Sequence, residues 1–248
     1  MSVINCPRKL AIIPVYDQVG TIGNVLARFK ENAVDEICLV IDCPTVDLLR
    51  VVERACRENK IQTHIIKNSR RMGVGYAIRE GIKYALDNRY DVIVIMAGND
   101  KDDPSEIPRL LNPILREDYD YVQGSRFLPS GRRIKNPILR GLFSRLYPFL
   151  WTICTDIRCT DVTNGFRAYK TRIFQDKHIN IWQSWLDGYG LEYYLHFKVL
   201  KLHYKTKEVP VSKTYPYRHK GGYSKILPLH DWWQIVGPFV YLTLGIRE

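Results

Sequence analysis

The chain has 248 residues, of which 46% are hydrophobic and 25% are charged. This is the composition of an ordinary folded protein, so collagen-like, low-complexity and disordered classes are excluded, and the length favours one compact domain. The 37 Lys and Arg against 26 Asp and Glu give a net charge of +11, which indicates an anionic partner such as nucleic acid, an acidic membrane surface or a phosphorylated substrate.

The beginning of the chain and its cysteines bear on location. The segment MSVINCPRKL leads into no long apolar run, so we predict no signal peptide. No stretch reaches about 18 uninterrupted apolar residues, so we predict no membrane span. The six cysteines form no CxxC pair, which favours reduced thiols. These observations predict a cytoplasmic protein.

Apolar runs alternate with segments of helical spacing in the first hundred residues. The predicted strands are 10–15, 36–41, 64–66 and 91–96, and the predicted helices are 21–30, 46–59 and 75–87. This alternation predicts an α/β fold with a mostly parallel central sheet, flanked by helices and joined by right-handed crossovers. Ligands of such sheets lie beyond the carboxyl ends of the strands, so the chemistry is expected directly after each strand.

The pattern is less regular after Pro104. We predict helices at 105–115 and 191–202, strands at 120–123 and 207–211, a loop at 128–136, a turn-rich segment at 160–165 and a basic loop at 218–225. An amphipathic helix is predicted at 138–155. This helix and the aromatic segment 232–241 could lie in a membrane interface. Alternatively, both pack on the sheet or form a contact in a homo-oligomer. We divide the chain into a domain, 1–228, and an aromatic tail, 229–248.

An acidic turn follows the predicted strand at 91–96. Its sequence is GNDKDDP, and it carries Asp100, Asp102 and Asp103. Carboxylates this close repel one another unless a cation or solvent relieves them, and Mg²⁺ binds one or two carboxylates together with phosphate oxygens. Asp100 and Asp102 are therefore candidate ligands of a metal shared with a diphosphate. A solvated acidic turn that caps a helix from Ser105 explains the same residues.

Two further segments are basic and contain glycines. RRMGVG, residues 70–75, leads into a predicted helix, where glycines would let the backbone approach a phosphate at the helix N-terminus. It is neither a full GxGxxG nor a P-loop, so those two classes of nucleotide site are not predicted. RHKGGYSK, residues 218–225, could fold over an anionic ligand and neutralise a diphosphate leaving group.

Taken together in order, these segments resemble a known family. The chain is similar to family-2 glycosyltransferases of the GT-A fold, in particular to the dolichyl-phosphate mannose or glucose synthase branch. The resemblance covers residues 10–228. The segments that carry it are IPVYDQVGTI from Ile13, VIDCPTVD from Val40, RMGVGYAIREG from Arg71, MAGNDKDDPSEIP from Met96, GSRF from Gly124, DVTNGFRAYK from Asp161, KEVPV from Lys207 and RHKGGYSKI from Arg218.

The resemblance implies a role for each matching residue. The nucleotide pocket would hold Pro14, Tyr16, Asp17, Asp42, Arg71 and Gly73. The metal site, for Mg²⁺ or Mn²⁺, would be Asp100, as the surviving carboxylate of a DxD motif, and Asp102, which stands where the family has a metal-contacting Gln. Arg126 would face the acceptor phosphate, and Arg218 and Lys225 would hold the donor diphosphate. Gly190 and Glu192 would lie near the acceptor.

Two residues depart from the family's pattern. Gly98 stands where the first Asp of DxD belongs, so metal dependence is a hypothesis for this chain. Cys43, followed by Pro44, stands where the second Asp of VDDGS belongs, which leaves the donor nucleotide open.

The implied reaction is the inverting transfer of a sugar from a nucleoside diphosphate to a polyprenyl phosphate or to a surface glycan. A phosphate oxygen is already anionic and needs positioning more than a base. A sugar hydroxyl needs a carboxylate to take its proton, and the candidates are Asp161, Asp187 and Glu192. The alternatives are a nucleotidyltransferase, an inactive member of the family, and a nucleic-acid-binding protein.

Overall fold

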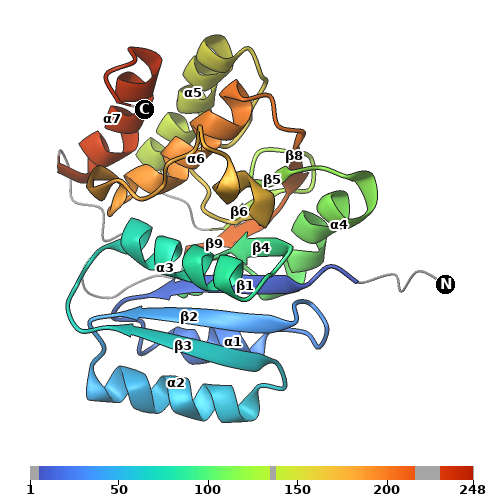
Figure 1. Ribbon diagram of the computed structural model, residues 1–248, viewed down its shortest axis with the longest axis vertical. Helices are drawn as coiled ribbons and strands as arrows, with labels where there is room; N and C mark the ends of the chain where they lie inside the picture. Colours follow the sequence, from blue (N-terminus) through green and yellow to red (C-terminus); the bar gives the residue numbers. More distant parts are fainter. Residues whose placement is uncertain (1–5, 135–137, 216–229, 248) are drawn as a thin grey trace.

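The structure is a computed structural model that describes residues 6–134, 138–215 and 230–247. Its centre is a seven-stranded sheet in the order β3-β2-β1-β4-β7-β5-β8, and a small parallel sheet pairs β6 with β9 (Figure 1). The strands are β1 (Lys9–Val15), β2 (Glu36–Asp42), β3 (Gln62–Asn68), β4 (Val92–Ile95), β5 (Tyr121–Ser125), β6 (Arg132–Ile134), β7 (Arg167–Lys170), β8 (Thr206–Pro210) and β9 (Ser212–Thr214).

The described residues also form seven α-helices and three short 3₁₀ segments, which lie between the strands except for the last helix, α7, which follows β9. The helices are α1 (Ile22–Ala27), α2 (Val46–Glu58), α3 (Val74–Asp87), α4 (Ile107–Glu117), α5 (Ile138–Thr155), α6 (Gly190–Lys201) and α7 (His230–Thr243). The 3₁₀ segments are Pro104–Glu106, Thr171–Gln175 and Ser184–Leu186. No helix among the described residues has the length and apolar character that crossing a bilayer requires.

The predicted α/β fold with a mostly parallel sheet is confirmed. All four strands predicted in the first hundred residues are present, and β1 pairs in parallel with both β2 and β4. Three strands were not predicted: β6, β7 and β9. The first of these lies in the segment predicted as a loop, 128–136, and β7 runs antiparallel to both of its neighbours, β4 and β5.

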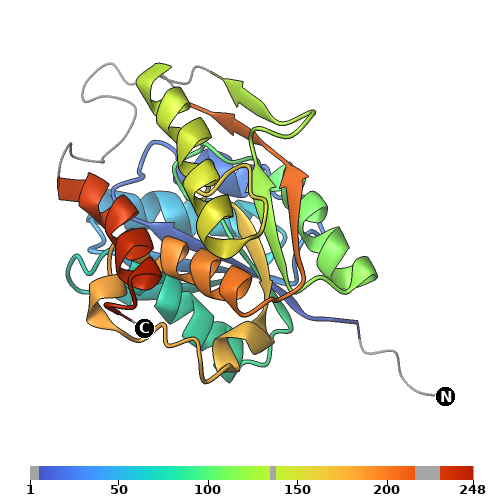
Figure 2. The same ribbon diagram turned by 90° about the horizontal axis from the view of Figure 1, so that it is seen from above.

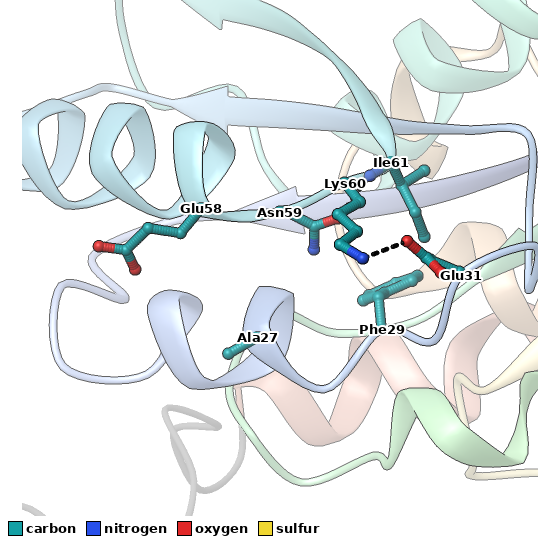
Figure 3. Close-up of a pocket in the computed structure, with 7 residues that line it drawn as sticks. All are labelled: Ala27, Phe29, Glu31, Glu58, Asn59, Lys60 and Ile61. Carbon is teal, nitrogen blue, oxygen red and sulfur yellow. Dashed lines mark hydrogen bonds and ion pairs between the residues drawn. The ribbon is translucent and has the colours of Figure 1, made fainter.

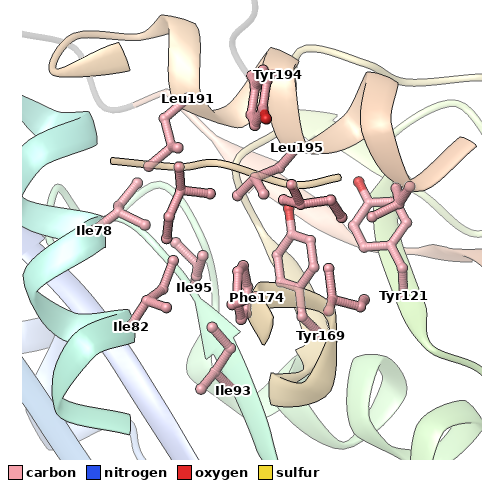
Figure 4. Close-up of a cluster of buried hydrophobic side chains, with 14 of the residues drawn as sticks. Ile78, Ile82, Ile93, Ile95, Tyr121, Tyr169, Phe174, Leu191, Tyr194 and Leu195 are labelled. Carbon is pink, nitrogen blue, oxygen red and sulfur yellow. The ribbon is translucent and has the colours of Figure 1, made fainter. Parts of the chain in front are cut away.

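The sheet is buried on both faces because its strands alternate between two apolar clusters. Leu10 and Ile12 of β1 point into the cluster under α3 and α6, whereas Ala11, Ile13 and Val15 point into the cluster under α1, α2 and α4. Figure 4 shows the first of these clusters, with side chains of α3, β4, β5, β7 and α6 meeting above the sheet. Helices on both faces are the usual cover of a parallel sheet.

Helices α5, α6 and α7 gather beyond the second half of the sheet (Figure 2). Phe239 of α7 packs against Tyr147 and Trp151 of α5, with ring centroids 5.9 and 5.2 Å apart in edge-on and tilted arrangements. Leu242 of α7 is buried in the same apolar cluster as these rings. The segment predicted as a tail therefore packs, in its described part, against the body of the protein. All six cysteines are free thiols in the structure.

A buried histidine gives this packing a pH dependence. His196 of α6 is 1% exposed, its Nδ1 lies 2.9 Å from the Tyr121 hydroxyl, and its Nε2 has no hydrogen-bond partner among the described residues. Burial lowers the pKa of His196 well below its usual value, with a smaller effect of Arg167 in the same direction. The folded protein therefore keeps this ring neutral in a pH range where the unfolded chain takes up a proton.

We expect the free energy of unfolding to decrease as the pH is lowered below the histidine's unfolded pKa of about 6.5. The unfolded state then binds a proton that the folded state does not, which costs up to about 1.4 kcal/mol of unfolding free energy per pH unit. Urea titrations between pH 7.5 and 5 measure the effect. His196→Phe should remove this part of the slope, whereas His203→Asn, at an exposed histidine, should keep it. Equal slopes in His196→Phe and the wild type would contradict the assignment.

Candidate functional site

The candidate site lies where the order of the strands reverses. The chain runs outward from β1 to β2 and β3 and then returns to β4 on the other side of β1. Ligands of open α/β sheets bind at such a point, beyond the carboxyl ends of the strands. The loops after β1 and β4 are joined there, because the Thr21 hydroxyl donates to the Gly98 carbonyl oxygen at 3.0 Å.

Two of the predicted nucleotide-binding residues meet at this edge. The Arg71 guanidinium lies over the ring of Tyr16, 4.7 Å from its centroid. Pro14 lies half-buried at the end of β1, and Asp17 is exposed with a left-handed backbone, φ 54°. The structure thus brings residues from the ends of β1 and β3 together. Their contact with a nucleotide stays a prediction.

Asp42, at the end of β2, is buried and already has partners. Its carboxylate accepts hydrogen bonds from the backbone N–H groups of Met72 and Gly73 at 2.9 Å and from the Asn68 amide at 3.3 Å. These bonds fix the turn between β3 and α3. The predicted contact of Asp42 with a base or ribose stays a prediction, and the function that the structure assigns to this carboxylate is to hold the turn.

The glycines of RRMGVG allow a close approach, but to the protein's own backbone. A Cβ at Gly75 would lie 1.9 Å from the Leu186 carbonyl oxygen, and one at Gly73, where φ is 105°, would lie 2.4 Å from that of Asp187. The Tyr76 N–H also donates to the Asp187 carbonyl at 3.0 Å. Interpreting these glycines as a phosphate cradle is therefore wrong: the chain segment 186–188 fills the space in front of α3.

The acidic turn after β4 contains two separate ion pairs. Arg28, at the end of α1, pairs with Asp100, which has a left-handed backbone. The Lys213 ammonium of β9 donates to Asp102 at 2.8 Å and to the side-chain oxygen of Asn164 at 2.8 Å. Asp102 is 1% exposed. Each carboxylate thus has a basic partner of its own, and the sharing of one metal ion by Asp100 and Asp102 stays a prediction.

The third carboxylate of this turn has the capping role that the sequence left open. Asp103 accepts a hydrogen bond from the Ser105 N–H at 3.0 Å and so caps the 3₁₀ segment Pro104–Glu106. Among the described residues, no group of three or more His, Cys, Asp or Glu side chains is placed to hold a metal ion.

Arg126 and Asp161 form a buried ion pair rather than facing a substrate. The guanidinium donates twice to the Asp161 carboxylate at 2.7 Å, and also to Tyr215 and Thr163 at 2.6 Å. The two charged side chains are 1% and 0% exposed. The predicted contact of Arg126 with an acceptor phosphate is therefore wrong in this arrangement, as is an accessible role for Asp161 as a base.

The turn that carries Asp161 is fixed by a carboxylate from β8. Glu208 accepts hydrogen bonds from the backbone N–H groups of Thr160 and Asp161 at 2.8 and 3.1 Å. Burial raises the pKa of the Glu208 carboxyl, and these amide hydrogen bonds oppose the shift. The glutamate of KEVPV is thus a structural support of the site.

The other two candidate bases differ in their surroundings. Asp187 forms an ion pair with the buried Arg79 of α3, whose guanidinium also donates to the carbonyl oxygens of Ile181 and Gln183. Glu192 lies in the first turn of α6, which begins at Gly190. Glu192 is half-buried, and its carboxylate makes no hydrogen bond or ion pair with another described residue. The Asp187 side chain is 35% exposed despite its ion pair with Arg79.

The remaining predicted residues, Arg218 and Lys225, lie outside the described part of the chain. Conversely, sequence reasoning missed Arg28, Lys213, Asn164 and Glu208. One sequence signal pointed to Lys213. It lies two residues after the apolar Val211, so in an extended strand both side chains are on the same, buried face.

A pocket elsewhere on the molecule does not compete for the role of active site. It is lined by residues that precede β3 and by the end of α1, which places it at the opposite edge of the sheet (Figure 3). An ion pair of Lys60 with Glu31, 2.7 Å long, crosses it. It contains none of the residues singled out above.

Comparison with known proteins gives one family and a set of relatives. The profile described as Glycosyl transferase family 2 matches residues 10–176. An undecaprenyl-phosphate mannosyltransferase of Micrococcus luteus is 29% identical over 210 residues, which is 83% of either chain. A polyprenol monophosphomannose synthase of Mycolicibacterium smegmatis is 24% identical over 84% of this chain and 77% of its own.

Solved structures share the fold. Glucosyl-3-phosphoglycerate synthase of Mycobacterium tuberculosis, in complex with Mn²⁺, UDP-glucose and phosphoglyceric acid, superposes with a TM-score of 0.66 at 17% identity, covering 98% of this chain and 81% of its own. The same enzyme is also known with Mg²⁺ and UDP. A divalent metal ion therefore occurs together with UDP or UDP-glucose in a protein of this fold.

The close packing in front of α3 can be tested with one methyl group. Gly75→Ala should lower the unfolding free energy by about 2 kcal/mol, because the new Cβ overlaps backbone atoms that cannot move cheaply. Helix propensity alone predicts the opposite sign, a gain of up to about 1 kcal/mol. Thermal unfolding measures the difference. Gly20→Ala is the control, since nothing lies within 4 Å of its Cβ; a stabilised Gly75→Ala would refute the packing.

Proposed function

The chain belongs to glycosyl transferase family 2, and on that premise we propose that it transfers a sugar from a nucleoside-diphosphate donor to a polyprenyl phosphate. The two relatives named above act, by their names, on undecaprenyl phosphate and polyprenol phosphate. Each aligns with more than four fifths of this chain, so these matches cover more of it than the family profile, which matches residues 10–176.

The state of the candidate bases supports a phosphate acceptor. A hydroxyl acceptor needs a nearby carboxylate to remove its proton, whereas a phosphate monoester is already anionic at neutral pH. Asp161 is buried against Arg126, and Asp187 pairs with Arg79. Of the three candidates, only Glu192 forms no ion pair among the described residues. The pairing of the other two candidate bases with arginines is the observation that carries the proposal.

The reaction then depends on positioning and charge. A phosphate oxygen of the acceptor attacks the anomeric carbon of the donor sugar from the side opposite the leaving group. The new carbon–oxygen bond forms as the bond to the nucleoside diphosphate breaks, so the configuration at that carbon inverts. Alignment of the two reactants supplies much of the rate enhancement, and basic side chains at the switch point stabilise the charge that develops on the diphosphate.

The activity itself is measured by mass spectrometry of the lipid product. Undecaprenyl phosphate incubated with the protein and UDP-glucose or GDP-mannose should gain the mass of one hexose, with release of one nucleoside diphosphate. Hydrolysis of the donor without a lipid product, or no turnover of either donor by folded protein, would count against the proposal.

Glu192→Gln separates the two kinds of acceptor. With a phosphate acceptor we expect kcat to stay within about threefold of wild type, because no proton has to be removed. Loss of a general base would instead cost about 10²–10⁴-fold. Glu53→Gln, at an exposed position of α2, is the matched control.

We also propose that the protein meets its lipid substrate at a membrane surface, through the outer face of α5. Tyr147 and Trp151 of this helix are buried, whereas Phe149, Leu150 and Ile153 are 66%, 48% and 58% exposed. Trp233 of α7 is 53% exposed and belongs to a helix of the same group. A helix that buries one face and exposes apolar side chains on another is suited to an interface, and the net charge of +11 favours anionic headgroups. A peripheral position of this kind is compatible with the predicted cytoplasmic location.

Vesicle sedimentation tests this surface. The double variant Phe149→Ser with Ile153→Ser should bind phosphatidylglycerol-containing vesicles at least about tenfold more weakly, because burying each side chain is worth about 1.5–3 kcal/mol. Val46→Ser is the control, since Val46 is 64% exposed on α2, at the far end of the molecule from α5 (Figure 1). Unchanged binding of the double variant would rule out α5 as the contact.

A further inference from the structure

The resemblance implies a divalent ion at the turn after β4, and the residues of this chain do not fit one. The resemblance places the first Asp of its DxD motif at Gly98. A Cβ at Gly98 would lie 3.2 Å from the Gln18 side-chain oxygen, 3.3 Å from Ile22 and 3.4 Å from Ile13. Gly98 supplies no carboxylate, and a side chain there would need Gln18 and Ile22 to give by a few tenths of an ångström.

The second metal position, Asp100, is engaged from the other side. Arg28 pairs with its carboxylate, and the same guanidinium nitrogen lies 3.4 Å from the Asp102 carbonyl oxygen. The arginine side chain is 42% exposed. Arg28 is therefore accessible to a ligand at the point where the strand order reverses, which is where ligands of this class of sheet bind.

The third position, Asp102, has the most enclosed cation. Its carboxylate is fully buried, and the Lys213 side chain is 10% exposed. Lys213 comes from 111 residues further along the chain and is also held by Asn164, so two of its three N–H donors are taken by described residues. A divalent ion bound to Asp102 would lie directly against this ammonium group.

The charges balance without a metal. Two carboxylates and one divalent ion sum to zero, and so do Asp100, Asp102, Arg28 and Lys213. A buried carboxylate requires such a partner, and an organic cation built into the chain is permanently present. In this chain the Lys213 ammonium group thus neutralises Asp102, as a bound metal ion would.

We propose that this protein binds its donor diphosphate without a divalent metal ion, with Lys213 compensating Asp102 and Arg28 contacting the diphosphate. The inference rests on the proposed function, since it concerns the donor of that reaction. Lys213 is a positioning residue: it fixes the turn and its charge from within. Arg28 is the group that reaches the ligand and stabilises the charge on the leaving diphosphate.

Calorimetric titration of the full chain with UDP, GDP and CDP, in EDTA and in Mn²⁺ or Mg²⁺, tests this. We expect one of the three to bind in EDTA with a Kd that the metals change by less than about twofold. Binding that requires metal, or that metal tightens tenfold or more, overturns the inference and leaves the proposed function standing. Binding of none of them in any buffer overturns both.

Variants of the two cations identify their roles. Arg28→Gln should weaken binding in EDTA about tenfold, and Arg28→Lys should restore part of it. Lys30→Met, at an exposed cation two residues away, should have no effect. Wild-type affinity of Arg28→Gln in EDTA would overturn the role of Arg28.

Lys213→Met distinguishes a lysine that takes the place of a metal ion from one that only stabilises the fold. Without the ammonium group, Asp102 becomes available to a metal, so we expect binding that is weak in EDTA and at least about fivefold tighter in Mn²⁺. A folded Lys213→Met protein, checked by circular dichroism, with no response to Mn²⁺ would overturn the role of Lys213. If this variant does not fold, we replace it with the double variant Lys213→Met and Asp102→Gln, which leaves no buried charge. Unchanged affinity of the double variant for the nucleotide in EDTA overturns the role of Lys213. A loss of about tenfold supports it.

Discussion

A carboxylate removed from water needs a cation or several hydrogen-bond donors, and this requirement shapes the edge of the sheet where the site lies. Asp42 takes amide donors from the turn before α3, and Glu208 takes them from the turn before β7. The other acidic groups take basic side chains: Asp102 with Lys213, Asp161 with Arg126 and Asp187 with Arg79. Each pairing ties a loop to an element distant in sequence, so the edge is held as one connected unit.

The same pairings decide which groups are left for chemistry. A side chain that is buried and fully partnered stabilises the site but does not reach a substrate. Arg126 and Asp161 therefore support the site from within. Solvent can reach Tyr16, Arg71, Arg28, Asp187 and Glu192. The division agrees with a reaction that needs positioning and positive charge more than proton transfer.

The first half of the fold, from β1 to β4, could be predicted from the sequence, because its strands are continuous apolar runs separated by helices of regular spacing. The second half was harder. The strand β7 has four residues, RAYK, with no clear period, and it is a strand because β4 and β5 pair with it on both sides. Lys213 lies on the polar strand SKT, which looks solvent-exposed in sequence, and only the tertiary contact with Asp102 accounts for its burial. Motif order located the right loops, but partners distant in sequence decided what each side chain does.

The reversed direction of β7 has a consequence for how such a protein can diversify. Because β7 pairs antiparallel, with Arg167 opposite Ile95, its beginning lies at the edge where β4 ends. The segment leading into β7 therefore borders the site, and a change of length between α5 and β7 would remodel that border without altering the register of β1 to β4. One half of the molecule is constrained by its continuous parallel pairing, and the other is open to insertion.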